Sequence, residues 1–141
     1  MTRSDTMIRR VLVVTGGSRG IGAATAKLGA AAGYRVCINY RGNEDAANAV
    51  VDDIVRSGGE AIAVAADVGE EAEVVRLFET IDKQLGPVTA LVNNAGILEP
   101  QMRVEDMDAA RLARILAVNV TGSFLCAREA VRRMSTEKGG Q

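Results

Sequence analysis

A glycine-rich segment, TGGSRGIG at residues 15–22, is the part of the sequence best suited to hold a charged ligand. Gly16, Gly20 and Gly22 follow the spacing G-x-x-x-G-x-G, which differs from the G-x-G-x-x-G of the commonest dinucleotide fingerprint. Glycines let such a turn tighten and approach a pyrophosphate, and the N–H groups and dipole of a following helix attract its negative charge. The segment therefore predicts a phosphate loop, and a glycine-rich turn without a ligand is the alternative interpretation.

A second candidate is Asn119, the polar residue in the otherwise apolar stretch 115–120. Burial of an unpaired amide is costly, so its structural explanation would be an Asn bonded to neighbouring backbone at a local distortion of its helix. Other chemistry-bearing types are scarce, because the sequence contains no histidine and only two cysteines. Cys37 and Cys126 lie far apart in apolar segments, which predicts buried free thiols and no metal site.

Composition favours a single soluble domain in a reducing, cytoplasmic compartment. The chain has 141 residues, and its net charge of −1 offers no general attraction to nucleic acid or to an anionic membrane. No uninterrupted apolar run approaches the ~20 residues that a membrane span requires. Residues 1–10 lack the apolar centre of a secretory signal and are expected to form a short tail. We therefore expect neither nucleic-acid nor membrane partners.

The elements that must position these residues alternate regularly along the chain. Short β-branched runs predict strands buried on both faces at residues 11–15, 35–40, 61–65 and 89–93. Helical spacing predicts helices at residues 20–32, 44–57, 70–85 and 106–134, with Asn43 as a cap of the second. This β-α order with short connections predicts an α/β fold, in which right-handed crossovers wrap a parallel sheet.

Two motifs on the first and fourth predicted strands carry a family resemblance. TGGSRGIG at residues 15–22 and NNAG at residues 93–96, with this separation and topology, resemble the short-chain dehydrogenase/reductase family. Residues 66–68, ADV, and residues 118–122, VNVTG, agree with it. The resemblance covers the chain from about Val11 onward. It implies a Rossmann-like doubly wound sheet in three α/β/α layers, of which residues 11–141 would form the first four strands and four helices.

The resemblance also implies a nicotinamide dinucleotide site and assigns roles within it. The cofactor-binding positions would be Gly16, Ser18, Arg19, Gly20, Ile21, Gly22, Tyr40, Arg41, Asp67, Val68, Asn93, Ala95 and Gly96. Asp67 and Val68 would contact adenine, and Thr15 and Asn93 are expected to steady each other across neighbouring strands. Asn119 would be the Asn of a catalytic tetrad, holding a water of the proton relay.

The cofactor is expected to be NADP(H). Preference in this fold is decided at the end of the second strand, where an acidic residue would bond a ribose 2′-OH. Tyr40 occupies the position that the family uses for that carboxylate, Arg41 follows it, and Arg19 precedes the second glycine of the loop. Basic residues at these places resemble the NADP-preferring pattern, because guanidinium groups can clamp a 2′-phosphate. The alternative is that both arginines are only solvated.

The family's catalytic serine and its Tyr-x-x-x-Lys pair have no counterpart in these 141 residues. Neither Tyr34 nor Tyr40 is followed four residues later by lysine, and Ser123 and Ser135 match no catalytic position. The resemblance implies that the chain is the N-terminal half of a single Rossmann-type domain. Its C-terminal half would carry these three residues and pack against this one, and the chain alone would be inactive.

The expected function is an NADP(H)-dependent oxidoreductase that transfers hydride between nicotinamide and a carbonyl or alcohol substrate, whose pocket the segment 97–104 would edge. The alternative is a non-catalytic dinucleotide-binding or interaction module. The last predicted helix carries more apolar residues than one buried stripe needs: Leu112, Ile115, Leu116, Val118, Phe124, Leu125 and Val131. They fit a helix covered by later parts of its own domain, or the family's subunit interface in a dimeric or tetrameric homo-oligomer, which we expect.

Overall fold

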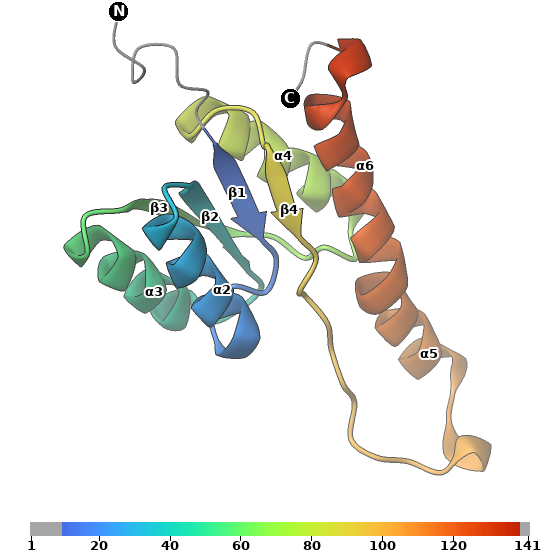
Figure 1. Cartoon of the computed structure of the whole chain (residues 1–141). Helices are drawn as coiled ribbons and strands as arrows, with labels where there is room; N and C mark the ends of the chain where they lie inside the picture. Colours follow the sequence, from blue (N-terminus) through green and yellow to red (C-terminus); the bar gives the residue numbers. More distant parts are fainter. Residues whose placement is uncertain (1–9, 139–141) are drawn as a thin grey trace, which may run out of the picture.

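The computed structural model describes residues 10–138, so the tail expected at residues 1–10 lies outside it except for Arg10. Four parallel strands form one sheet in the order β3-β2-β1-β4 (Figure 1). Their bounds are β1 (Val11–Val14), β2 (Arg35–Tyr40), β3 (Glu60–Ala65) and β4 (Ala90–Val92). Each lies within one residue of its predicted start and end. This is the Rossmann-like α/β fold that the alternation of elements predicted.

Helices cover both faces of the sheet, so the molecule has three layers (Figure 1). One face packs against α2 (Gly20–Ala31) and α3 (Glu44–Arg56), and the other against α4 (Glu71–Gln84) and α6 (Gly122–Met134). The alternation of side chains along β1 divides the core, because Leu12 and Val14 join the first layer while Val11 and Val13 join the second.

Burial of the strands follows their place in the sheet. The central strands β1 and β2 are buried along most of their length. The expectation of burial on both faces is wrong for β3 and β4, which are the outer strands among the described residues and are partly exposed. Cys37 and Cys126 are buried free thiols, as predicted. The Asn43 side chain caps α3 by accepting a hydrogen bond from the N–H of Ala46 at 3.0 Å, also as predicted.

The last predicted helix is divided by a distortion. It begins at Ala109 instead of residue 106, because the Asp108 side chain caps it by accepting from the Arg111 N–H at 2.8 Å. A short 3-10 turn, Val104–Asp106, precedes it. Helix α5 (Ala109–Leu116) then passes into a π-helical turn at Ala117–Thr121, and α6 follows. Such π turns are frequent at functional sites, and this one contains Asn119.

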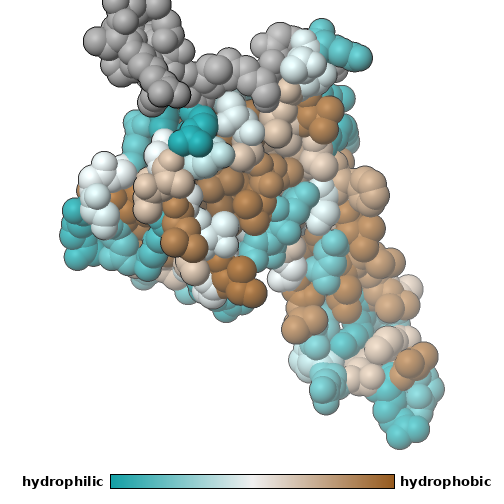
Figure 2. Space-filling model, viewed as in Figure 1, coloured by the Kyte–Doolittle hydropathy of each residue, from teal (hydrophilic) through white to brown (hydrophobic). Residues whose placement is uncertain are grey.

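One side of α5 and α6 is apolar and exposed, as the brown surface over these helices shows (Figure 2). Its largest side chains are Leu112, Leu116, Val120, Phe124 and Val131, with Phe124 74% exposed. By length and composition the 26 residues of Ala109–Met134 could cross a membrane, which the count of uninterrupted apolar residues did not indicate. Core helices pass the same test, but only 17% of the tested window is buried, and the buried residues that pack into the core lie in the π turn and α6, namely Val118, Cys126 and Ala130.

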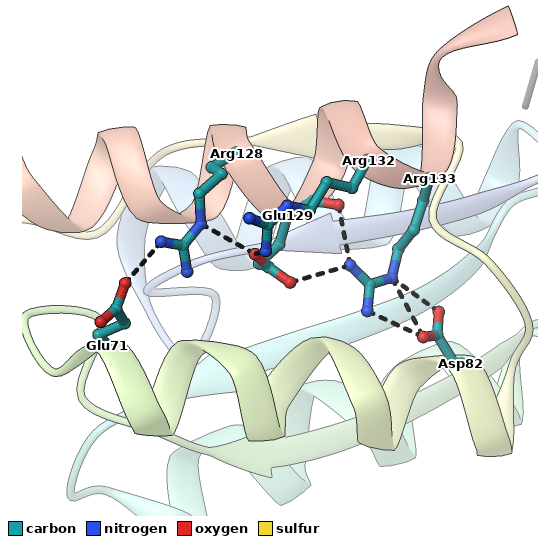
Figure 3. A network of polar contacts seen from close by, with 6 residues as sticks. All are labelled: Glu71, Asp82, Arg128, Glu129, Arg132 and Arg133. Carbon is teal, nitrogen blue, oxygen red and sulfur yellow. Dashed lines mark hydrogen bonds and ion pairs between the residues drawn. The ribbon is translucent and has the colours of Figure 1, made fainter. Parts of the chain in front are cut away.

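A polar network joins α6 to α4 and fixes where the π turn stands relative to the sheet (Figure 3). Arg128 on α6 reaches Glu71 on α4 at 2.5 Å. Arg133, one helical turn further, pairs with Asp82 at 2.9 Å. Between them Glu129 points into the interface and is only 3% exposed. The two ends of the helix pair are thus tied by separate ion pairs.

Glu129 is buried but charged, because three guanidinium groups surround its carboxylate. Arg128, Arg132 and Arg133 donate to it at 3.0, 2.8 and 3.2 Å. Burial would raise the pKa of Glu129, but the hydrogen bonds from Arg128 and Arg133 and the charge of Arg132 outweigh that effect and hold this pKa below its ordinary value. The carboxylate therefore stabilises the folded chain at neutral pH.

Candidate functional site

A cavity of about 450 Å³ opens at the carboxyl ends of the strands. In open α/β sheets ligands bind at this edge, where neighbouring crossovers diverge. Its lining contains the predicted cofactor-binding residues except Gly22 and Asn93. It also contains residues that the sequence analysis did not assign to cofactor binding, namely Asn39, Gly42, Asn43, Ala66, Asn94, Ile97 and Val118. Of the segment 97–104, Ile97 alone belongs to this lining.

The glycine loop forms the floor of this cavity between β1 and α2. Gly16 has a φ of 62°, a left-handed conformation that residues with a Cβ rarely adopt. Gly22, in the first turn of α2, lies so close to the loop that a Cβ there would stand 2.4 Å from the carbonyl oxygen of Gly16. Arg19 precedes α2 without a side-chain cap, so the first N–H groups of the helix face outward for a ligand.

Thr15 and Asn94 tie the loop to the end of β4. The Thr15 hydroxyl accepts from the N–H groups of Asn94 and Ala95, both at 3.0 Å. The Asn94 amide donates to the carbonyls of Thr15 and Gly16 at 3.1 and 2.9 Å. The expectation that Asn93 would steady Thr15 is therefore wrong.

The turn that follows β4 explains this difference. The Asn94 N–H bonds back to the carbonyl of Val92 at 3.0 Å, so the chain bends and the second asparagine of the motif faces Thr15. Asn93 is exposed, and its amide instead donates to the carbonyl of Ser123 on α6 at 3.1 Å. Asn93 thus links the end of β4 to the helix that follows the π turn.

Asn39, near the end of β2, was not selected from the sequence. Its side chain is 2% exposed and accepts from the N–H of Gly16 at 3.3 Å. Its amide donates to the carbonyl of Ala66 at 3.1 Å and more weakly to that of Val64 at 3.4 Å. The signal that marks it in the sequence is one polar residue inside the apolar strand sequence VCINY.

Two arginines and one carboxylate lie at the rim of the cavity. The Arg41 Nε lies 3.7 Å from an oxygen of Asp67, and the Arg41 side chain is 60% exposed. Within residues 10–138 Arg19 is exposed and has no ion pair. Asp67 is held in place because its other oxygen accepts from the N–H of Gly69 at 2.9 Å. The structure thus brings both guanidinium groups and Tyr40 to one cavity.

Asn119 does not line the cavity, but it forms hydrogen bonds with Ile97, a residue that does. Its Oδ1 accepts from the N–H of Ile97 at 2.7 Å, and its Nδ2 donates to the carbonyl of Ile97 at 2.9 Å. This is the backbone-bonded Asn at a helix distortion that the sequence analysis offered as the structural explanation of its place in an apolar helix. Ile97 and the neighbouring Val118 are lining residues. Asn119 therefore fixes the segment after β4 against the π turn.

Comparison with known proteins identifies the family. The sequence profile described as short chain dehydrogenase matches residues 10–141. The chain belongs to the short-chain dehydrogenase/reductase family. Members of this family are oxidoreductases that use nicotinamide cofactors.

Individual relatives agree with the family profile. An uncharacterized oxidoreductase, YgfF, of Escherichia coli is 52% identical over 130 residues, which are 92% of this chain and 53% of that protein. A 3-oxoacyl-(acyl-carrier-protein) reductase of Synechocystis is 42% identical over 136 residues, or 94% of this chain and 53% of that protein. A short chain dehydrogenase of Burkholderia cenocepacia in complex with NADP superposes with a TM-score of 0.83 at 37% identity, covering 87% of this chain and 50% of that one. The chain thus spans about half the length of these relatives.

Proposed function

We propose that this chain binds NADP(H) in the cavity and forms the cofactor-binding part of an oxidoreductase that acts on a carbonyl or alcohol substrate. The observation that carries the proposal is the rim of the cavity, where Arg19 and Arg41 flank a position that Tyr40 occupies in place of a carboxylate. The complex of the Burkholderia cenocepacia relative with NADP supports it. The bound cofactor would supply or accept the hydride.

The residues of the floor fit the pyrophosphate of such a cofactor. Gly16 and Gly22 leave no Cβ where the loop and the helix approach each other, and the uncapped start of α2 offers N–H groups and positive dipole to the phosphates. Asp67 and Val68 would receive the adenine, and Ala95 and Gly96 would line the cofactor beyond the pyrophosphate. Gly20, Ile21 and Ser18 complete the wall on the side of the glycine loop.

The arginines would hold the 2′-phosphate more strongly than Arg41 holds Asp67. An exposed ion pair contributes about 0–1 kcal/mol. A hydrogen bond to a charged group contributes about 1.5–3 kcal/mol, so one guanidinium–phosphate contact corresponds to at least about a tenfold preference for NADP(H). A carboxylate at position 40 would repel the 2′-phosphate. Tyr40 carries an uncharged phenol there, so this repulsion is absent.

Titration tests this preference. The protein, purified as its gene encodes it, should bind NADP⁺ at least about tenfold more tightly than NAD⁺. Arg41→Asp should abolish most of that ratio, because it removes one guanidinium and adds a repelling charge. Arg56→Asp on α3 makes the same charge change at an exposed site outside the cavity and should preserve the ratio. Equal affinities in the unmodified protein, or a preference for NAD⁺, would refute the NADP(H) assignment.

The hydride transfer also needs a proton donor. In the family arrangement this is a tyrosine activated by a lysine, with a serine orienting the substrate, and the 141 residues contain no Tyr-x-x-x-Lys. We propose that Asn119 serves the proton relay and that the three remaining groups come from a C-terminal half of the domain. The coding sequence downstream of Gln141 decides between the proposals: a serine followed by Tyr-x-x-x-Lys supports the enzyme, and a stop codon favours a non-catalytic binding module.

Two further features complete the proposal. The exposed apolar side of α5 and α6 would be covered in a homo-oligomer, because a surface of this kind is rarely left in water. The two buried free thiols fit a reducing compartment, which supports a cytoplasmic location. Size-exclusion chromatography with light scattering tests the homo-oligomer, and a monomeric protein at micromolar concentration would contradict it.

A further inference from the structure

Asn39 spans the carboxyl ends of three strands. It is the penultimate residue of β2, and its side chain reaches Gly16 after β1 and Ala66 after β3. Its main-chain carbonyl also accepts from the N–H of Gly17 at 2.9 Å. The N–H groups of Gly16 and Gly17 are therefore both bonded to Asn39. The same amide reaches the residue that immediately precedes Asp67.

Gly16 forms main-chain hydrogen bonds with two side chains. Its N–H donates to Asn39 Oδ1 at 3.3 Å, and its carbonyl accepts from Asn94 Nδ2 at 2.9 Å. Both main-chain polar groups of this left-handed glycine thus bond to side chains, and neither takes part in the strand ladder. An aliphatic residue at position 39 would leave the Gly16 N–H and the Ala66 carbonyl without these hydrogen bonds. The hydrogen bonds of the Asn39 side chain therefore fix the position of the glycine loop relative to β2 and β3.

We propose that Asn39 is a positioning residue for the cofactor, which holds the glycine loop in the conformation that receives the pyrophosphate. The inference rests on the proposed function, since it concerns the same site. It differs from the role of Arg41 in one measurable respect. NADP(H) and NAD(H) share the pyrophosphate, so loss of the Asn39 contacts should weaken both cofactors by the same factor and leave their ratio unchanged.

Asn39→Asp tests the hydrogen-bond pattern with almost no change of shape. A protonated carboxyl keeps an acceptor for the Gly16 N–H and an O–H donor for the Ala66 carbonyl. An ionised carboxylate has lost the donor and brings negative charge beside the loop. Burial raises the pKa of such a carboxyl above its ordinary value, so the ionised fraction should increase across the range from about pH 5 to about pH 8. Cofactor affinity of this variant should therefore decline with rising pH.

Affinities for NADP⁺ and NAD⁺ are measured by calorimetry at both ends of this range and divided by the wild-type values at the same pH. The affinity of Asn39→Asp relative to wild type should fall by at least about tenfold between about pH 5 and about pH 8. The fall should be equal for NADP⁺ and NAD⁺. Arg19, Arg41 and Asp67, the charged groups of the same cavity, are present in both proteins, so the comparison with wild type isolates the effect of the group at position 39. Asn48→Asp, the same substitution at an exposed position on α3, should show no such change.

Asn39→Ala covers the case in which the aspartate variant unfolds at the higher pH. It should weaken both cofactors by about tenfold at every pH. Binding within twofold of wild type by folded Asn39→Ala, or by folded Asn39→Asp at about pH 8, overturns this inference and leaves the proposed function intact, as does loss of NADP⁺ binding alone. A wild-type protein that binds neither cofactor overturns the proposed function and the inference together. A merely structural role would lower the unfolding midpoint without changing the affinity of the folded protein.

Discussion

Gly22→Ala tests whether the close approach of α2 to the glycine loop outweighs the helix propensity of alanine in setting the free energy of unfolding. The added Cβ would stand 2.4 Å from the Gly16 carbonyl oxygen and 2.5 Å from Asn94 Nδ2. Backbone cannot rotate away, so α2 or the loop must shift, which costs about 1–3 kcal/mol by analogy with overpacked cores. Loss of the Asn94–Gly16 hydrogen bond adds about 0.5–1.5 kcal/mol, and alanine returns at most about 1 kcal/mol of helix propensity. The net expectation is a destabilisation of about 0.5–3.5 kcal/mol.

Gly29→Ala is the matched control, because Gly29 lies in the same helix and gains the same propensity. Its Cβ would lie 2.4 Å from Leu12 Cδ2, the end of a side chain and not backbone, and at ordinary contact distance, 3.9 Å, from Leu12 Cγ and Val36 Cγ2. Urea unfolding should give a stability within about 1 kcal/mol of wild type for this variant. Calorimetry should show weaker cofactor binding for Gly22→Ala alone. If the two variants are equally stable and bind cofactor alike, the close approach at Gly22 does not matter and the reasoning is refuted.

The remaining predictions concern α6 and the π turn before it. Asn119→Ala should lower kcat of the enzyme by about 100-fold or more, with a smaller effect on cofactor affinity, because a proton relay serves the chemical step; unchanged turnover in steady-state kinetics would leave Asn119 a structural residue. Glu129→Gln should lower the free energy of unfolding by about 1–3 kcal/mol at neutral pH. The pKa of Glu129 is lower in the folded chain, so this loss should shrink as the pH falls below the ordinary carboxyl range. Glu71→Gln, at a 63% exposed carboxylate of the same network, should cost less than about 1 kcal/mol in the same urea titrations, and an equal cost would contradict the role of burial.

Local patterns in the sequence determined the elements and their order. Strand and helix periodicity, the Asn43 cap and the glycine-rich turn act between residues close in the chain, so all are visible without a structure. The phosphate loop, the end of the second strand and the motif after the fourth were selected for the same reason. Parallel strands place their carboxyl ends at one edge, which is why separate motifs could be expected to share one cavity. The structure agrees, since nearly all of these residues line it.

The tertiary structure alone decided which polar groups pair. Asn93 and Asn94 are adjacent and chemically identical, and only the bend after β4 turns the second one toward Thr15. The contact of Asn39 with Gly16 joins residues 23 positions apart, and a strand pattern marks it only as one polar residue among apolar ones. The three guanidinium groups around Glu129 stand on α6 itself, but the packing of α6 against α4 decides that this carboxylate is buried and that Arg128 and Arg133 also pair with Glu71 and Asp82. Periodicity reports which face of an element is buried, whereas the partner of a buried polar group is set by the packing of elements distant in sequence.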